Sequence, residues 1–224
     1  MNLRVSSYLL CALLSIIVPG GPSTIAQQNP PTLLPVDEAV SRPDFFTFRS
    51  QLQTVIARHD ALALVDFLDP KIKNNFGGDD GIEAFQRIWR VAEADSKLWS
   101  ELGTVLALGG SFTGKDEFTA PYTFSRWPND LDAFDYVAVI GSNVRVRAQP
   151  NLDSSTIATV NFAVLPLDVE STAKDWHDQA WAAVKVAGKK GYIATRFIRS
   201  SIDYRAQFTY SGGRWRLTFF LAGD

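Results

Sequence analysis

Apolar residues between positions 41 and 107 recur at spacings of three and four, which is the period of an α-helix. A first helix is predicted from Ser41 to Arg58, since a capping serine and an early proline open it. A short second helix is expected from Ala61 to Leu68, where Asp69-Pro70 ends it. The predicted buried stripes are Phe45, Phe48, Leu52, Val55 and Ile56; Ile82, Phe85, Ile88, Trp89 and Ala92; and Leu98, Trp99, Leu102, Val105 and Leu106.

The segments that flank these stripes carry turn residues. "NNFGGDDG" (Asn74–Gly81) is a predicted turn in which Asp80 caps the third helix. Ser96 starts the fourth helix, and Gly109-Gly110 ends it. Residues 111–135 are irregular and rich in aromatic side chains, so we expect them to pack over the helices as a long loop.

From Tyr136 onward the period of the apolar residues changes to two, which is typical of strands. Short polar turns separate the predicted strands, and Gly188–Gly191 is expected at a hairpin tip. A last hairpin turns at Ser211-Gly212-Gly213. The predicted strands are Tyr136–Ile140, Asn143–Arg147, Thr156–Val160, Leu165–Glu170, Ala180–Val186 and Gly191–Ala194. Several short strands at this spacing favour a small barrel.

The order of motifs between Tyr136 and Arg199 resembles the bacterial SH3 (SH3b) family. The matching stretches are Val144–Pro150, the serine-containing loop Asn151–Ser155, Ile157–Val160, Trp181–Val186 and Gly191–Ile198. The chain departs from the family pattern at Arg145, where asparagine is usual, and at Gln149, where glycine precedes the proline. If the family glycine has a positive φ, Gln149 strains that loop. The resemblance implies a barrel of about five strands that binds cell-wall peptides or proteins, and it implies no catalytic residues.

The closing stretch "GRWRLTFFLAGD" resembles the last strand of NTF2-like domains, in which Trp215, Leu217, Phe219 and Leu221 alternate. We therefore expect the closing hairpin to return to the helical region, with the barrel inserted between them. The predicted fold class is α+β. Its parts are a signal peptide (1–26), a Pro-rich linker (27–40), a helical domain (41–134), an SH3-like barrel (135–200) and the hairpin (201–224).

The N-terminus has the features of a secretory signal peptide. Arg4 precedes the apolar run Tyr8–Val18, which is shorter than a membrane span, and cleavage is expected after Ala26. The alternative is an uncleaved anchor helix. The protein is thus predicted to be secreted, into the periplasm, with no membrane span after cleavage. Its formal net charge of −2 argues against a nucleic-acid surface.

Candidates for chemistry are few. Cleavage removes the only cysteine, Cys11, and the two histidines, His59 and His177, have no metal-site spacing. We therefore predict no metal, no cofactor and no enzyme activity. The enzyme alternative is a cell-wall hydrolase that uses a carboxylate pair. The acids available to it are Asp79, Asp80, Glu83, Glu93, Glu101 and Glu117.

Aromatic residues in the strand region are the better signal for binding. Trp176 lies in the polar stretch "AKDWHDQAW", where it either contacts a ligand or folds back onto the barrel. The predicted ligand contacts are Trp176, His177, Trp181 and Tyr192, with Arg147 as a partner for a carboxylate. We expect a non-catalytic protein that binds a cell-wall (peptidoglycan) peptide or an envelope protein. A second alternative is an NTF2-like small-molecule pocket in the helical half.

Overall fold

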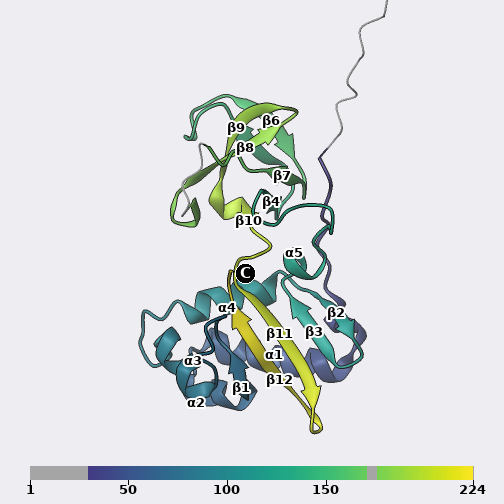
Figure 1. The fold of residues 1–224 in the computed structure, drawn as a ribbon, viewed down its shortest axis with the longest axis vertical. Helices are drawn as coiled ribbons and strands as arrows, with labels where there is room; N and C mark the ends of the chain where they lie inside the picture. The colour runs from purple at the N-terminus through teal and green to yellow at the C-terminus, as the bar shows by residue number, and fades with distance from the viewer. Residues whose placement is uncertain (1–29, 171–175, 224) are drawn as a thin grey trace, which may run out of the picture.

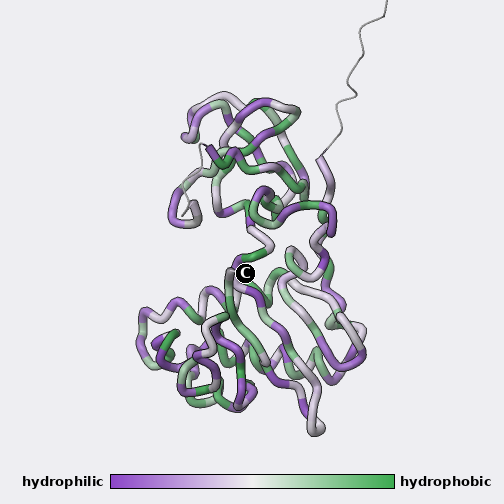
Figure 2. Tube along the Cα trace, in the orientation of Figure 1, coloured by the Kyte–Doolittle hydropathy of each residue, from purple (hydrophilic) through white to green (hydrophobic). Residues whose placement is uncertain are grey.

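The computed structural model describes residues 30–170 and 176–223, except the side chain of His177. The predicted signal peptide lies outside these residues. The predicted α+β class is confirmed, since helices and several sheets are present. Figure 1 shows two lobes, which we call the lower lobe (43–120 and 204–221) and the upper lobe (136–199). Hydrophobic and hydrophilic residues alternate along the elements of both lobes (Figure 2).

The lower lobe is built on one five-stranded sheet with the order β1-β12-β11-β3-β2. Its strands are β1 (Leu68–Lys73), β2 (Ser111–Gly114), β3 (Glu117–Ala120), β11 (Arg205–Ser211) and β12 (Arg214–Leu221). The C-terminal hairpin β11–β12 lies between β1 and β3, which come from the N-terminal half of the chain. The β1–β12 pair is parallel, whereas the other pairs are antiparallel.

Helices pack on this sheet around an aromatic core. They are α1 (Pro43–Ala57), α2 (Ala61–Leu64), α3 (Ile82–Trp89) and α4 (Leu98–Ala107), with short 3₁₀ turns at Glu38–Ser41 and Val65–Phe67. The stripe predicted for α4 is buried throughout, from Leu98 to Leu106. The stripe predicted for α3 is wrong at Ile88, which is 42 % exposed, and at Ala92, which is exposed because the helix ends at Trp89. The ring of Phe45 in α1 lies 4.3 Å from that of Phe118 in β3.

Three further predictions for this lobe are wrong. The predicted loop of residues 111–135 contains the hairpin β2–β3 and a short helix, α5 (Tyr122–Ser125), because β3 pairs with β11 across a large sequence separation. The helix predicted from Ala61 to Leu68 ends at Leu64 and continues as a 3₁₀ turn to Phe67, and Leu68 begins strand β1. Asp80 does not cap α3; its carboxylate accepts a hydrogen bond from the Asn74 backbone at 3.2 Å and so closes the turn.

The upper lobe consists of two small sheets around one core, and its described strands do not close into a hydrogen-bonded barrel. One sheet contains β10 (Ile198–Arg199), β4 (Tyr136–Val139) and β7 (Val164–Pro166), and the other contains β6 (Thr156–Val160), β5 (Val144–Arg147), β9 (Lys189–Ala194) and β8 (Trp181–Val186). A single bridge between Leu167 and Val184 joins them. Strand β7 is three residues long, shorter than the predicted Leu165–Glu170 strand. Two 3₁₀ turns, Trp176–Asp178 and Thr195–Phe197, complete the lobe.

The extended segment before α1, predicted as a linker, pairs with both lobes. Leu33 donates its backbone N–H to the Phe162 carbonyl at 2.7 Å, and Glu38 donates to the Gly110 carbonyl at 2.9 Å. Leu33 also joins Tyr122, Ala138 and Val164 in a small buried cluster between the lobes. The described part of this segment therefore acts as a strap that fixes the two lobes to each other.

We predict that Tyr122→Phe raises the free energy of unfolding by about 1 kcal/mol, since a buried hydroxyl without a partner destabilises the folded state. Tyr122 is 1 % exposed, and its hydroxyl has no hydrogen-bond partner among the described residues. Burial raises the pKa of Tyr122 to about 12. Chemical denaturation measures the change, and Tyr136→Phe, on a half-buried neighbour of the same cluster, is the control. A loss of stability in Tyr122→Phe would mean that the hydroxyl is hydrogen-bonded.

Candidate functional site

Three of the predicted contact residues share one face of the four-stranded sheet. Arg147 of β5 pairs with Tyr192 of β9, which pairs in turn with Ala183 of β8. Trp181 precedes Ala183 by two residues, so its side chain is on the same side of the sheet. The side chains of Arg147, Trp181 and Tyr192 are all half-buried. We call this surface the outer face; it consists of Arg145, Arg147, Trp181, Lys185, Lys190 and Tyr192.

The outer face carries an ion cluster that sequence reasoning did not identify. The Asp168 carboxylate, 8 % exposed, lies 3.8 Å from the Lys185 ammonium and 3.5 Å from the Lys190 ammonium. Its backbone N–H donates to the Ala183 carbonyl at 2.9 Å, which fixes it beside β8. Burial tends to lower the pKa of Lys190, but Tyr192 and Asp168 outweigh this effect and raise that pKa. Lys185 is four residues after Trp181 on β8, and Lys190 is two residues before Tyr192 on β9. Because side chains at even spacings share one side of a strand, the sequence could have predicted that the lysines lie beside these aromatic residues.

Arg147 anchors the loop that follows β5. Its Nη1 donates to the Ser154 carbonyl at 2.6 Å, and the Gln149 backbone N–H donates to the Ser154 hydroxyl at 2.9 Å. Gln149 is not among the residues with positive φ, so the strain considered for a non-glycine residue there is absent. The loop is thus held at the edge of the outer face by side chains that the sequence supplies locally.

Trp176 does not lie on the outer face. It is 7 % exposed and packs into the upper-lobe core with Val184, Ile193 and Ile198, which corresponds to the fold-back alternative. One edge of the same residue lines the space between the two lobes. The side chain of His177 lies outside the described residues, so the structure brings together three of the five predicted contacts and separates Trp176 from them.

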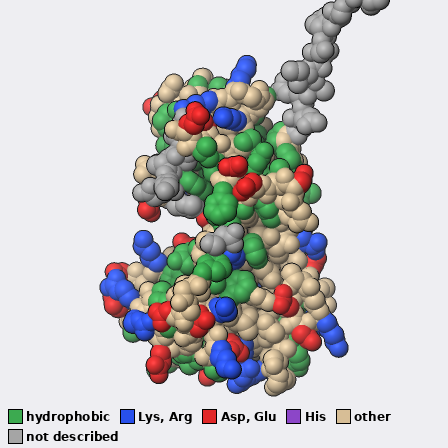
Figure 3. Space-filling view, viewed as in Figure 1, with side chains coloured by type: hydrophobic (Ala, Val, Ile, Leu, Met, Phe, Trp, Pro, Cys, Tyr) green, Lys and Arg blue, Asp and Glu red, His purple; other side chains and the backbone are tan. Residues whose placement is uncertain are grey.

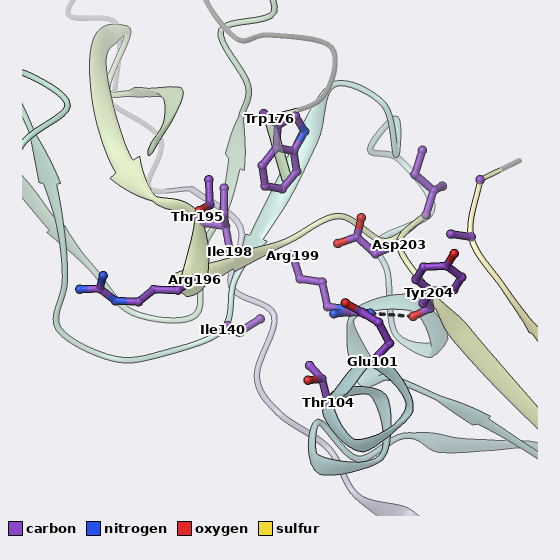
Figure 4. Close-up of a pocket in the computed structure, with 13 residues that line it drawn as sticks. Glu101, Thr104, Ile140, Trp176, Thr195, Arg196, Ile198, Arg199, Asp203 and Tyr204 are labelled. Carbon is purple, nitrogen blue, oxygen red and sulfur yellow. Dashed lines mark hydrogen bonds between the residues drawn. The ribbon is translucent and has the colours of Figure 1, made fainter. Parts of the chain in front are cut away.

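A cleft of about 630 Å³ lies where the lobes meet. Figure 3 shows hydrophobic side chains on the described surface beside this hollow, and Figure 4 shows the lining residues. Glu101 and Thr104 of α4 form one wall, and Ile140, Ile198 and Arg199 of the upper lobe form the opposite wall. These residues are separated by up to about a hundred positions along the chain, which is why no sequence motif marked the cleft.

The acids named for a carboxylate pair are distributed over several separate contacts. Asp79 pairs with Arg87 at 2.5 Å, Glu93 pairs with Arg90, and the Glu117 carboxylate accepts a hydrogen bond from the Thr113 hydroxyl. His59 stacks on Trp99 with ring centroids 5.2 Å apart. Within residues 30–170 and 176–223, no three His, Cys, Asp or Glu side chains are grouped as a metal site requires.

A search for membrane spans gave none among the helices of the described ranges, which are too short or too polar to cross a bilayer. Comparisons with protein-family models, with curated proteins and with solved structures found no match to this chain.

Proposed function

We propose that this protein is a non-catalytic, extracytoplasmic binding protein whose upper lobe holds a peptide of the cell wall on its outer face. One observation carries the proposal: Arg147, Trp181 and Tyr192 gather on one face with the ammonium groups of Lys185 and Lys190. Half-buried aromatic rings beside cations are the combination that gives contact energy and charge recognition in binding sites.

The charge of the outer face defines the chemistry of the ligand. Arg145, Arg147, Lys185 and Lys190 are cations, and Asp168 beside them is an acid shared between the two lysines. The excess of cations favours a segment that carries carboxylates, such as the peptide part of a cell wall, and it disfavours a cationic partner. The aromatic rings supply apolar contact for the rest of the peptide.

The packing of the lower lobe supports binding over the alternatives in the helical half. An NTF2-like small-molecule pocket requires space between the helices and the sheet. Aromatic rings fill that space: the ring centroid of Phe45 in α1 lies 4.7 Å from that of Trp215 in β12, and the centroid of Trp89 in α3 lies 5.0 Å from that of Phe220 in β12.

The proposal is tested by incubating the protein without residues 1–26 with purified peptidoglycan, and by assaying both co-sedimentation and the release of soluble fragments. We expect retention without release. The double variant Trp181→Ala/Tyr192→Ala is expected to bind at least about tenfold more weakly, because two aromatic contacts are lost. Leu62→Ala is the matched control, since Leu62 is an 87 % exposed apolar residue of the lower lobe.

Each outcome has a distinct meaning. Release of fragments would overturn the non-catalytic proposal and favour the hydrolase alternative. Retention that is equal in the double variant and the control would show that the outer face is not the site. Absence of retention would exclude the peptidoglycan peptide and leave an envelope protein as the partner to test by cross-linking.

A further inference from the structure

Arg199 is a buried cation in the wall of the cleft between the lobes. The residue is 8 % exposed, and it belongs to β10 in the upper lobe. Figure 4 shows its side chain running toward α4 of the lower lobe. Its Nη2 donates to the Tyr204 carbonyl at 2.7 Å, so the guanidinium is held at the boundary between the lobes.

The charge of Arg199 is incompletely satisfied by the described residues. Its Nε is buried without a hydrogen-bond partner among the described residues, and Glu101 of α4 lines the same cleft. A guanidinium has five N–H donors, and a buried charge without a counter-ion is costly. An anionic group in the cleft would supply the missing partner. Hence the arginine has the properties of a binding residue and not only of an interlobe contact.

The other charged residues of the cleft limit the negative charge that a bound ligand can carry. Arg196 is a second cation at the exposed rim, where its guanidinium lies 4.7 Å from the Phe197 ring centroid. Glu101 and Asp203 also line the cleft, so the charged groups among its described lining residues are two cations and two acids. A polyanion would be repelled by these acids, whereas a single carboxylate can approach Arg199.

The rest of the lining is largely apolar. Ile140, Ile198, Ile202 and the edge of Trp176 face the same space. A cleft of about 630 Å³ is within the size range of small-molecule sites, which are mostly apolar with a few polar groups that fix orientation. The space suits a ligand that has one charged end and one apolar end.

We infer that the cleft between the lobes is a second binding site, which takes a small monocarboxylate with an apolar body and holds its carboxylate on Arg199. The site is separate from the outer face and does not depend on the function proposed for that face. A bound ligand contacts both lobes, since Arg199 and Ile198 belong to one and Glu101 to the other.

The test uses N-acetyl-L-leucine as the probe and isothermal titration calorimetry on the chain without residues 1–26. We expect saturable binding with a Kd of about 1 mM, the affinity that a ligand of this size reaches. N-acetyl-L-leucinamide, which lacks the carboxylate, is expected to bind at least about tenfold more weakly, because a charge-assisted hydrogen bond is lost. Arg199→Met should weaken N-acetyl-L-leucine binding by a similar factor, whereas the control Arg58→Met, on an exposed arginine outside the cleft, should change it less than about threefold.

The comparison of acid and amide on the unmodified chain keeps the inference testable even if Arg199→Met fails to fold. Absence of saturable binding of N-acetyl-L-leucine would overturn the inference, and so would equal affinity for the acid and the amide. Equal binding by a folded Arg199→Met variant would show that Arg199 is an interlobe contact alone. Trp181→Ala/Tyr192→Ala should bind the probe normally, which separates this site from the outer face.

Discussion

Gly110→Ala is expected to lower the free energy of unfolding by about 3 kcal/mol, because a side chain has no room at this position. A Cβ on Gly110 would lie 2.2 Å from the Thr119 carbonyl oxygen and 2.9 Å from a ring carbon of Phe118. Gly110 also accepts a backbone hydrogen bond from Glu38, so the strap on one side and β3 on the other prevent movement. Thermal and urea denaturation measure the loss.

Gly114→Ala is the matched control for Gly110→Ala, since it places the same substitution in the same hairpin. No atom lies within 4 Å of a Cβ built on Gly114, and its φ is not positive. The free energy of unfolding of Gly114→Ala is expected to stay within about 0.5 kcal/mol of that of the unmodified chain, as for other substitutions at exposed positions. Equal stability of the two variants would mean that the strap and β3 adjust to the methyl group, and that the close packing at Gly110 does not restrict the fold.

The helices of the lower lobe were predictable because each buries a single stripe. Predicted and observed bounds of α1 agree within about two residues, and Gly109 ends α4 with a φ of 66°. The strand β1 was not predictable from local pattern, because Pro70 interrupts it and its partner β12 is about 150 residues away. The same reason applies to β3, a short run that pairs with the distant β11, while β2 pairs with β3 at the edge of the sheet.

The register of the last strand shows a limit of strict alternation. Trp215, Leu217 and Leu221 are buried as predicted, but Phe219 is half-buried and its neighbour Phe220 is fully buried. Gln207 pairs with Phe219 and Phe208 pairs with Leu217, so Thr218 is an extra residue in β12. A β-bulge of this kind reverses the parity of the residues that follow it. The residue types near Thr218 did not predict this bulge.

The outer face could be anticipated from the sequence, whereas the cleft could not. Alternation along β8 and β9 places Trp181, Tyr192 and the lysines on one side of the sheet, so knowledge of the strands was sufficient. The burial of Trp176 depends on tertiary packing and could not be predicted, because its neighbours in the sequence are polar and form no apolar stripe with it. Arg199 became a candidate only when the lobes were placed together, since its surroundings come from both.

Trp215→Ala is expected to lower the free energy of unfolding by about 3–5 kcal/mol, the usual cost of removing a large buried aromatic side chain. Trp215 is 3 % exposed, and its ring centroid lies 4.7 Å from that of Phe45 and 5.5 Å from that of Tyr210. The Arg42 guanidinium lies 4.7 Å from its centroid, and its Nε1 donates to the Asp44 carboxylate at 2.9 Å. The substitution therefore removes core packing, a cation–π contact and a hydrogen bond together, and urea denaturation measures the sum.

Trp215→Phe separates the hydrogen bond from the packing through its effect on pH dependence. Burial tends to raise the pKa of Asp44, but hydrogen bonds from Trp215, Arg42 and the Phe45 backbone outweigh it and lower that pKa. A lowered folded-state pKa stabilises the protein above the unfolded-state pKa, and the contribution is lost as pH falls through the folded-state value. Trp215→Phe should therefore raise the Asp44 pKa in an NMR titration and lose less stability than the unmodified chain between about pH 5 and pH 2. An unchanged Asp44 pKa in this variant would show that Arg42 and the Phe45 backbone, and not the indole, hold the carboxylate ionised.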